Sequence, residues 1–172
     1  MAIGLMNRRD FLIFGSALAL AACSQSQLVD NRTAPSLQVR EVIVTTSVSR
    51  KETALPKSQI VEATRSRVFS TLRQANPSGN RPIRVEVNIK QFYIANAGAG
   101  VLLGSSSSSI NTEIKLVDVA TNTQIGQTLN VFGATEPRPT IFGAAAIKSP
   151  QQELAIITND LAKRVKIAIY GE

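Results

Sequence analysis

The stretch from Ile83 to Tyr93 constrains the fold more than any other part of this 172-residue chain. Apolar and polar residues alternate along it, in the order IRVEVNIKQFY. Successive side chains of a β-strand point to opposite faces, so the pattern predicts a strand with one apolar and one polar face. Such a strand belongs to a sheet that is covered on one face and exposed to water on the other.

Three other stretches also have the composition of strands. Residues 37–45 are rich in β-branched side chains, and residues 110–117 alternate again. Residues 125–132 follow a run of turn-forming residues at 118–123. The second and third stretches together predict an antiparallel hairpin.

Residues 58–75 have the periodicity of an amphipathic helix. Ser58 is the expected N-cap, and the Pro- and Gly-containing run at 76–82 predicts where the helix ends. The apolar stripe of this helix is expected at Val61, Val68, Leu72 and Ala75.

The last stretch of the chain has the clearest helix signals. Ser149 is a good N-cap, Pro150 occupies the first helical position, and Gln152 completes a capping box. Gly171 marks the expected end. The expected apolar stripe is Leu154, Ile157, Leu161, Val165 and Ala168.

These elements follow one another in the order β-α-β-β-β-α. A helix with one apolar stripe and a sheet with one apolar face bury those surfaces against each other. The sequence therefore predicts an α+β fold: a small, mostly antiparallel sheet of about four strands with two amphipathic helices packed on one face.

The N-terminal residues have the pattern of a targeting segment. Arg8 and Arg9 precede an apolar run at 11–20, which is too short to span a membrane stably. We expect residues 1–22 to be a cleaved signal peptide, residues 23–36 a polar tether, and residues 37–172 a single domain. Two other interpretations stay open, a buried helix of a cytoplasmic protein and an exported domain without a lipid.

Leu20-Ala21-Ala22-Cys23 resembles the lipobox of bacterial lipoproteins. The resemblance implies acylation of Cys23, cleavage before it, and membrane attachment through its lipid. Ser24 follows the cysteine, which implies the periplasmic face of the outer membrane more than the inner membrane.

The residues around Arg8 and Arg9 resemble a twin-arginine export motif, which Phe11 and Leu12 also fit. Asn7 and Ile13 depart from that motif. General secretion with two ordinary arginines is the alternative route.

Composition argues against several kinds of function. The chain has no histidine and one cysteine, so it has no Ser-His or Cys-His pair, and we expect no catalytic residues, no metal and no cofactor. The carboxylates of Glu113, Asp118, Glu153 and Asp160 are expected to be isolated turn, cap or surface groups. The net charge of +7 comes without a nucleic-acid recognition motif, so we expect no nucleic-acid partner.

Two Gly- and Ala-rich stretches, residues 95–109 and 140–148, do not fit the regular elements. They either cap the open end of the core or form an apolar contact surface. Leu102, Leu103 and Phe142 are the expected partner contacts.

The domain resembles YajG-like lipoproteins and the periplasmic domain of the curli secretion lipoprotein. The residues that carry this resemblance are Gly98-Ala99-Gly100 and the turn from Leu116 to Gly126, where Asn122 stands at a position that is commonly glycine. The resemblance implies no catalytic residues. Without support for catalysis, two interpretations stay open: a non-enzymatic accessory protein that binds envelope proteins in assembly, transport or secretion, or a lipid or glycolipid carrier with an apolar pocket under the sheet.

Overall fold

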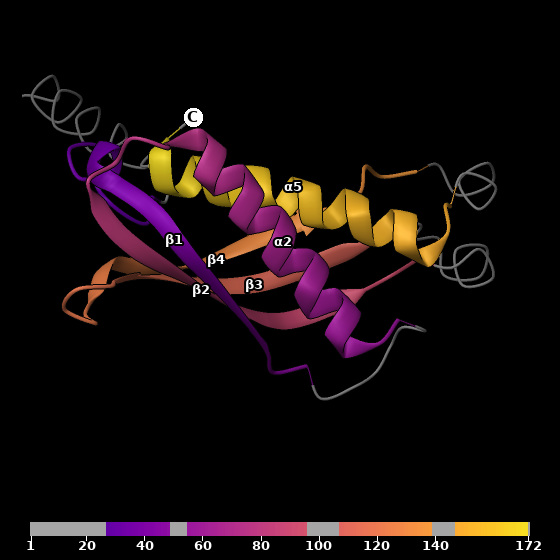
Figure 1. Cartoon of the computed structure of the whole chain (residues 1–172). Helices are drawn as coiled ribbons and strands as arrows, with labels where there is room; N and C mark the ends of the chain where they lie inside the picture. Colours follow the sequence, from indigo (N-terminus) through magenta and orange to yellow (C-terminus); the bar gives the residue numbers. More distant parts are fainter. Residues whose placement is uncertain (1–26, 49–54, 96–106, 139–146, 172) are drawn as a thin grey trace, which may run out of the picture.

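The computed structural model describes residues 27–48, 55–95, 107–138 and 147–171. A short 3-10 turn precedes four strands and two long helices (Figure 1). In chain order they are η2 (Ala34–Ser36), β1 (Leu37–Thr46), α2 (Lys57–Ala75), β2 (Arg81–Tyr93), β3 (Ser109–Asp118), β4 (Gln124–Ala134) and α5 (Pro150–Tyr170). The order β-α-β-β-β-α is as predicted, and the α+β class is confirmed.

The four strands form one sheet in the order β1-β2-β3-β4, and both helices cross the same face of it (Figure 1). Strand β1 pairs parallel to β2, whereas β2-β3 and β3-β4 are antiparallel. Helix α2 supplies the crossover that a parallel pair requires. Strands β1 and β4 are therefore the two edges.

Alternate residues of β2 are buried, as expected for a sheet with one apolar face. Ile83 and Val85 have no exposed surface, and Val87 and Ile89 are 1% exposed. The opposite face of the sheet carries charged side chains, among them Glu113 with Lys90 Nζ at 3.5 Å. One face of the sheet is thus core and the other is open.

Helix α5 follows its sequence signals closely. The Ser149 hydroxyl accepts a hydrogen bond from the Gln152 amide at 3.4 Å, and the Gln152 side chain accepts one from the Ser149 amide at 3.1 Å. Gly171 closes the helix with a φ of 79°. The predicted apolar stripe is buried.

Helix α2 differs from the prediction in its cap and its buried face. It begins at Lys57 after Pro56, and Ser58 lies inside it. Its buried residues are Ile60, Thr64, Val68 and Leu72. This row has regular four-residue spacing, and Thr64 fits because its hydroxyl donates to the Ile60 carbonyl at 2.8 Å.

The expected tether needs correction over residues 27–36, because these residues are part of the folded domain. Leu28 and Val29 are 1% and 5% exposed. The Leu28 amide donates to the Ala168 carbonyl at 2.8 Å, and the Leu28 carbonyl accepts from the Gln127 amide at 3.0 Å. Leu28 thereby joins the end of α5 to β4, and the domain begins at least as early as Gln27.

The turn between β3 and β4 is held by Asp118. Its carboxylate accepts from the amides of Ala120 and Thr121 and from Arg81 Nε at 2.7 Å. The hydrogen bond from Arg81 and those from the turn amides lower the pKa of Asp118. Asn122 has a φ of 53°, the left-handed conformation expected there.

The described helices include none that is long and apolar enough to cross a membrane.

Candidate functional site

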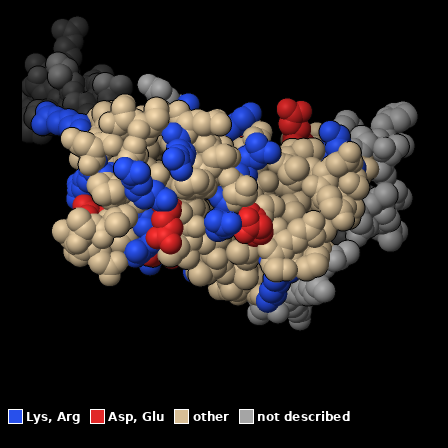
Figure 2. All heavy atoms as spheres, viewed as in Figure 1, with Lys and Arg blue, Asp and Glu red and all other residues tan. Residues whose placement is uncertain are grey.

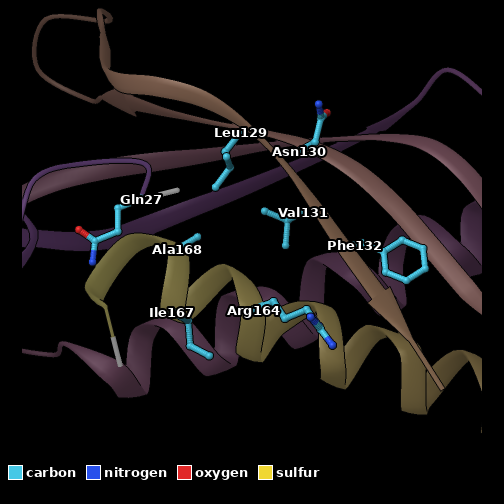
Figure 3. A pocket seen from close by; sticks show the side chains of 8 residues that line it. All are labelled: Gln27, Leu129, Asn130, Val131, Phe132, Arg164, Ile167 and Ala168. Atoms are coloured by element: carbon cyan, nitrogen blue, oxygen red, sulfur yellow. The ribbon is translucent and has the colours of Figure 1, made fainter. Parts of the chain in front are cut away.

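A groove runs between strand β4 and helix α5 (Figure 3). Its volume is about 450 Å³. The side chains that line it come from the domain's first described residue, from β4 and from α5: Gln27, Leu129, Asn130, Val131, Phe132, Arg164, Ile167 and Ala168.

The groove is a wedge because α5 approaches β4 closely at one end only. A Cβ atom added to Gly133 would lie 2.7 Å from the Ile157 carbonyl oxygen and 2.8 Å from Leu161 Cβ, so only glycine allows this contact. At the other end, Leu28 separates β4 from the end of α5. The groove occupies the space between these two points.

Exposed apolar side chains border the groove on both sides. Phe132 on β4 is 50% exposed and Ile167 on α5 is 44% exposed. Among the described residues, only Ile43 and Val119 are other large apolar side chains with comparable exposure. An apolar cluster beside a hollow is more informative than a single exposed residue, because such clusters mark interaction sites.

The outer edge of β4 borders the same groove. In an antiparallel pair the backbone groups of successive residues point alternately toward and away from the partner strand. The Ala134 amide points away from β3, because it donates to the Asp160 carboxylate at 2.9 Å. By this alternation the backbone groups of Asn130 and Phe132 also point outward.

The two ends of this edge have partners within the domain. Asp160 holds Ala134 at one end, and the Leu28 carbonyl accepts from the Gln127 amide at the other. The outward groups of Asn130 and Phe132 lie between them. Within the described ranges, the backbone groups in the middle of this edge have no hydrogen-bond partner.

The helix wall of the groove carries one charged lining residue, Arg164. Arg164 Nε donates to the Asp160 carboxylate at 2.9 Å, and the Arg164 side chain is 55% exposed. Lys163 beside it is exposed. Lys and Arg side chains outnumber acidic ones across the face that Figure 2 shows, so the field near the helices favours a negatively charged ligand.

A second polar feature lies at the bases of the two Gly- and Ala-rich stretches. The buried Glu153 carboxylate accepts from Arg138 Nη2 at 2.8 Å, from the Ser108 hydroxyl at 2.7 Å and from the Lys148 amide at 3.1 Å. Ser108 also accepts from the Ala95 amide at 3.0 Å. Glu153 thus ties together residues on both sides of each stretch.

The environment of Glu153 keeps it ionised. Burial by itself would raise the pKa of this carboxyl, but the hydrogen bonds from Arg138, Ser108 and Lys148 more than offset that effect and lower it. The expectation that Glu153 is an isolated cap or surface group is wrong. Its partners lie up to 45 residues away in sequence, and the fold brings them together.

The other residues predicted for function lie outside the described ranges. These are the lipidation residue, the residues of the processing box, those of the export motif and the expected partner contacts: Cys23, Leu20, Ala21, Ala22, Arg8, Arg9, Phe11, Leu12, Leu102, Leu103 and Phe142. Their roles remain predictions.

Sequence reasoning missed the groove, although two signals pointed to it. Phe132 is an aromatic residue at a position of β4 where the alternation calls for a polar side chain, and Ile167 lies off the apolar stripe of α5. Within the described ranges, no three His, Cys, Asp or Glu residues lie close enough together to hold a metal ion.

No protein-family model and no curated protein matches the chain. Several solved structures are similar to it at low identity. A PelC dodecamer from Paraburkholderia phytofirmans is 14% identical with a TM-score of 0.44, over 86% of this chain and 95% of that one. A minor lipoprotein from Acinetobacter baumannii is 10% identical with a TM-score of 0.44, over 80% and 92%.

A Xanthomonas campestris protein of the DUF330 family is 12% identical with a TM-score of 0.39, over 86% of this chain and 91% of that one. A similarity of this size assigns no function to the chain. The proposals below therefore depend on the residues themselves.

Proposed function

We propose that this chain is a lipid-anchored, non-enzymatic accessory binding protein of the bacterial envelope, and that the β4–α5 groove contacts an envelope protein. The observation that carries the proposal is the pair of exposed apolar side chains that border the groove, Phe132 on the outer side of β4 and Ile167 on α5. Burying such surface in a complex contributes roughly 25 cal/mol per Å².

The position of the groove agrees with attachment through Cys23. Cys23 precedes Gln27 by four positions, and Gln27 lines the groove. Four residues span at most about 14 Å when fully extended. An acylated Cys23 would hold the groove near the membrane surface, where an envelope protein is within reach, and Ser24 favours the outer membrane.

The alternative, a lipid or glycolipid carrier, requires an apolar pocket under the sheet. The described side chains between the sheet and the helices instead form one continuous core, which includes Val85, Ile114, Leu72 and Leu161. The groove lies at the edge of that core and is bordered by backbone groups of β4 that have no partner among the described residues. We therefore place protein binding before lipid transport.

A double variant tests the role of the groove. Phe132→Ala with Ile167→Ala removes the exposed apolar surface, and Ile43→Ala with Val119→Ala removes similar surface elsewhere. Each variant is crosslinked in membranes and purified, and partners are identified by mass spectrometry. We expect the groove variant to lose a partner that the control variant retains, with both melting temperatures close to wild type. The same partners with both variants would refute the proposal.

The anchor has its own test. We expect Cys23→Ser to abolish signal processing and membrane fractionation, because the sulfur is the point of acylation. Intact-mass measurement that finds an unmodified Cys23 in native membranes would contradict this.

The export route is tested separately. Replacing Arg8 and Arg9 by lysine is expected to block export. Normal export of that variant would identify general secretion as the route.

A further inference from the structure

We propose that the groove receives an extended, acidic peptide segment of the partner, which pairs with the outer edge of β4 as a fifth strand. This inference rests on the proposed function and names the chemistry of the ligand. Strand addition to a free sheet edge derives its affinity from main-chain hydrogen bonds and its specificity from the pockets that receive alternate side chains.

The main-chain part of the argument comes from Asn130 and Phe132. The Ala134 amide points away from β3, because it bonds to Asp160. Asn130 and Phe132 lie four and two positions before Ala134, so by the two-residue alternation each also presents one N–H and one C=O away from β3. Proteins normally protect such an edge. Among the residues that the structure describes, partners for this edge are found at its two ends, at Gln127 and Ala134.

The free part of the edge has the length of a short strand. Residues 128–133 lie between the two protected ends and span roughly 20 Å at the rise of a β-strand. A segment of about five or six residues fits there, which is an ordinary strand length.

The side chains on both sides of the edge define what the peptide should carry. Val131 points toward the helices and is buried, and Figure 3 shows Asn130 pointing the opposite way. Phe132 is exposed and, by the alternation of a strand, projects from the same face of β4 as Asn130. Alternate side chains of an added strand would enter the groove beside Ile167. The intervening side chains would lie next to Phe132, where aromatic cross-strand neighbours favour β-branched or aromatic partners.

Charge favours an acidic segment over a second copy of this chain. Arg164 uses Nε for Asp160 and exposes the rest of its guanidinium to the groove. A carboxylate of the peptide can bind there. Cleavage of residues 1–22, which include Arg8, Arg9 and Asp10, leaves 17 Lys and Arg against 11 Asp and Glu, and this net charge of +6 opposes association of two copies.

The experiment uses the anchored protein in detergent and a fluorescent peptide of about eight residues. Valine and threonine alternate in the peptide, and glutamate stands at each end. Asn130→Pro removes one outward N–H, and Asn130→Ala is the matched control that removes the side chain alone. Proline is tolerated on an edge strand when its nitrogen faces away from the ladder. Fluorescence anisotropy measures Kd, and the melting temperature reports folding.

We expect saturable binding to the wild type, and a Kd for Asn130→Pro about tenfold higher than the Kd for Asn130→Ala, which corresponds to the loss of one hydrogen bond. Equal Kd values for the two variants, or no saturable binding to the wild type, would overturn the proposal.

A second measurement does not depend on any protein variant. Peptides are N-methylated at alternate positions, in either of the two registers, and tested on the wild type. Strand pairing predicts that one register abolishes binding and the other preserves it, and equal effects would overturn it.

Two further results would replace the peptide by another occupant and so overturn the inference. In the first, the lipid-free Cys23→Ser protein binds anionic phosphatidylglycerol vesicles but not the peptide, and adding Phe132→Ala abolishes the vesicle binding. In the second, two copies of the wild-type protein form a dimer, and the Asn130→Pro variant is a monomer. If the inference fails while the Phe132/Ile167 variant still loses its partner in membranes, the proposed function stands with a different mode of contact.

Discussion

Replacing Glu153 by glutamine tests whether this buried carboxylate joins the bases of the two Gly- and Ala-rich stretches. Its side chain is fully buried and its ion-pair partner Arg138 is 14% exposed. Glutamine keeps the shape but removes the charge, so the bonds from Arg138 and Lys148 to its one remaining oxygen lose their charge-assisted strength. Its amide nitrogen replaces the oxygen that accepts from the Ser108 hydroxyl and can only donate, so the charge-assisted bond from Ser108 is lost. Hydrogen bonds to charged groups contribute about 1 kcal/mol more than neutral ones. Over three bonds, the free energy of unfolding should fall by about 3 kcal/mol, as is typical when a buried ion pair loses one partner.

The assay is thermal unfolding followed by circular dichroism. For a domain of this size, 3 kcal/mol corresponds to a fall of about 6–12 °C in melting temperature. Glu113→Gln is the matched control, because Glu113 pairs with Lys90 and Lys115 at 3.5 and 3.7 Å on the open face of the sheet. Such a pair contributes about 1 kcal/mol or less. Equal melting temperatures for the two variants would refute the structural role assigned to Glu153.

The pH dependence of the same variant provides a second check. The pKa of Glu153 in the folded protein lies below its ordinary value of 4.5. A carboxyl whose pKa falls on folding contributes stability that is present above the unfolded pKa and is lost as pH falls through the folded pKa. The difference in stability between wild type and Glu153→Gln should therefore be constant at neutral pH and narrow below pH 4.5. A difference that grows on acidification would contradict this sign.

Three further predictions concern local geometry and are measured by chemical denaturation. Gly133→Ala should destabilise the domain by about 1–3 kcal/mol, because the added Cβ meets α5 at 2.8 Å from Leu161 Cβ; stability equal to wild type would mean that α5 is not held against β4. Gly126→Ala should cost more than 1 kcal/mol, since Gly126 has a φ of 67° and the new Cβ would lie 1.9 Å from the Leu28 carbonyl oxygen; an unchanged midpoint would place Leu28 elsewhere. Ser149→Ala should lose about 1 kcal/mol through the N-cap of α5, and Ser149→Thr should restore most of it; equal losses in the two variants would exclude capping as the cause.

The strands and the start of α5 could be predicted because their signals are local. Alternation from Ile83 to Tyr93 follows from the two-residue period of an extended chain, and the pair Ser149 and Gln152 satisfies amides within a single turn. Neither depends on what lies across the core.

The buried face of α2 could not be predicted as well. The predicted face and the buried face share Val68 and Leu72. The fold buries Ile60 and Thr64, whereas the prediction had Val61 and Ala75, since Thr64 is polar. The choice between them is made by the surface of the sheet. Once the Thr64 hydroxyl bonds to the preceding turn, its polarity no longer opposes burial.

By itself, the sequence determined the order of the elements, the one-sided sheet, the capped final helix and the expectation of a lipid anchor at Cys23. All of these depend on neighbours within a few positions. The tertiary structure decided that residues 27–36 belong to the domain, that Glu153 has partners from distant stretches, and that a groove separates β4 from α5. The groove exists because Gly133 lets the helix approach at one point while Leu28 holds it away at another. That spacing is set by contacts between segments far apart in the chain, which no local pattern records.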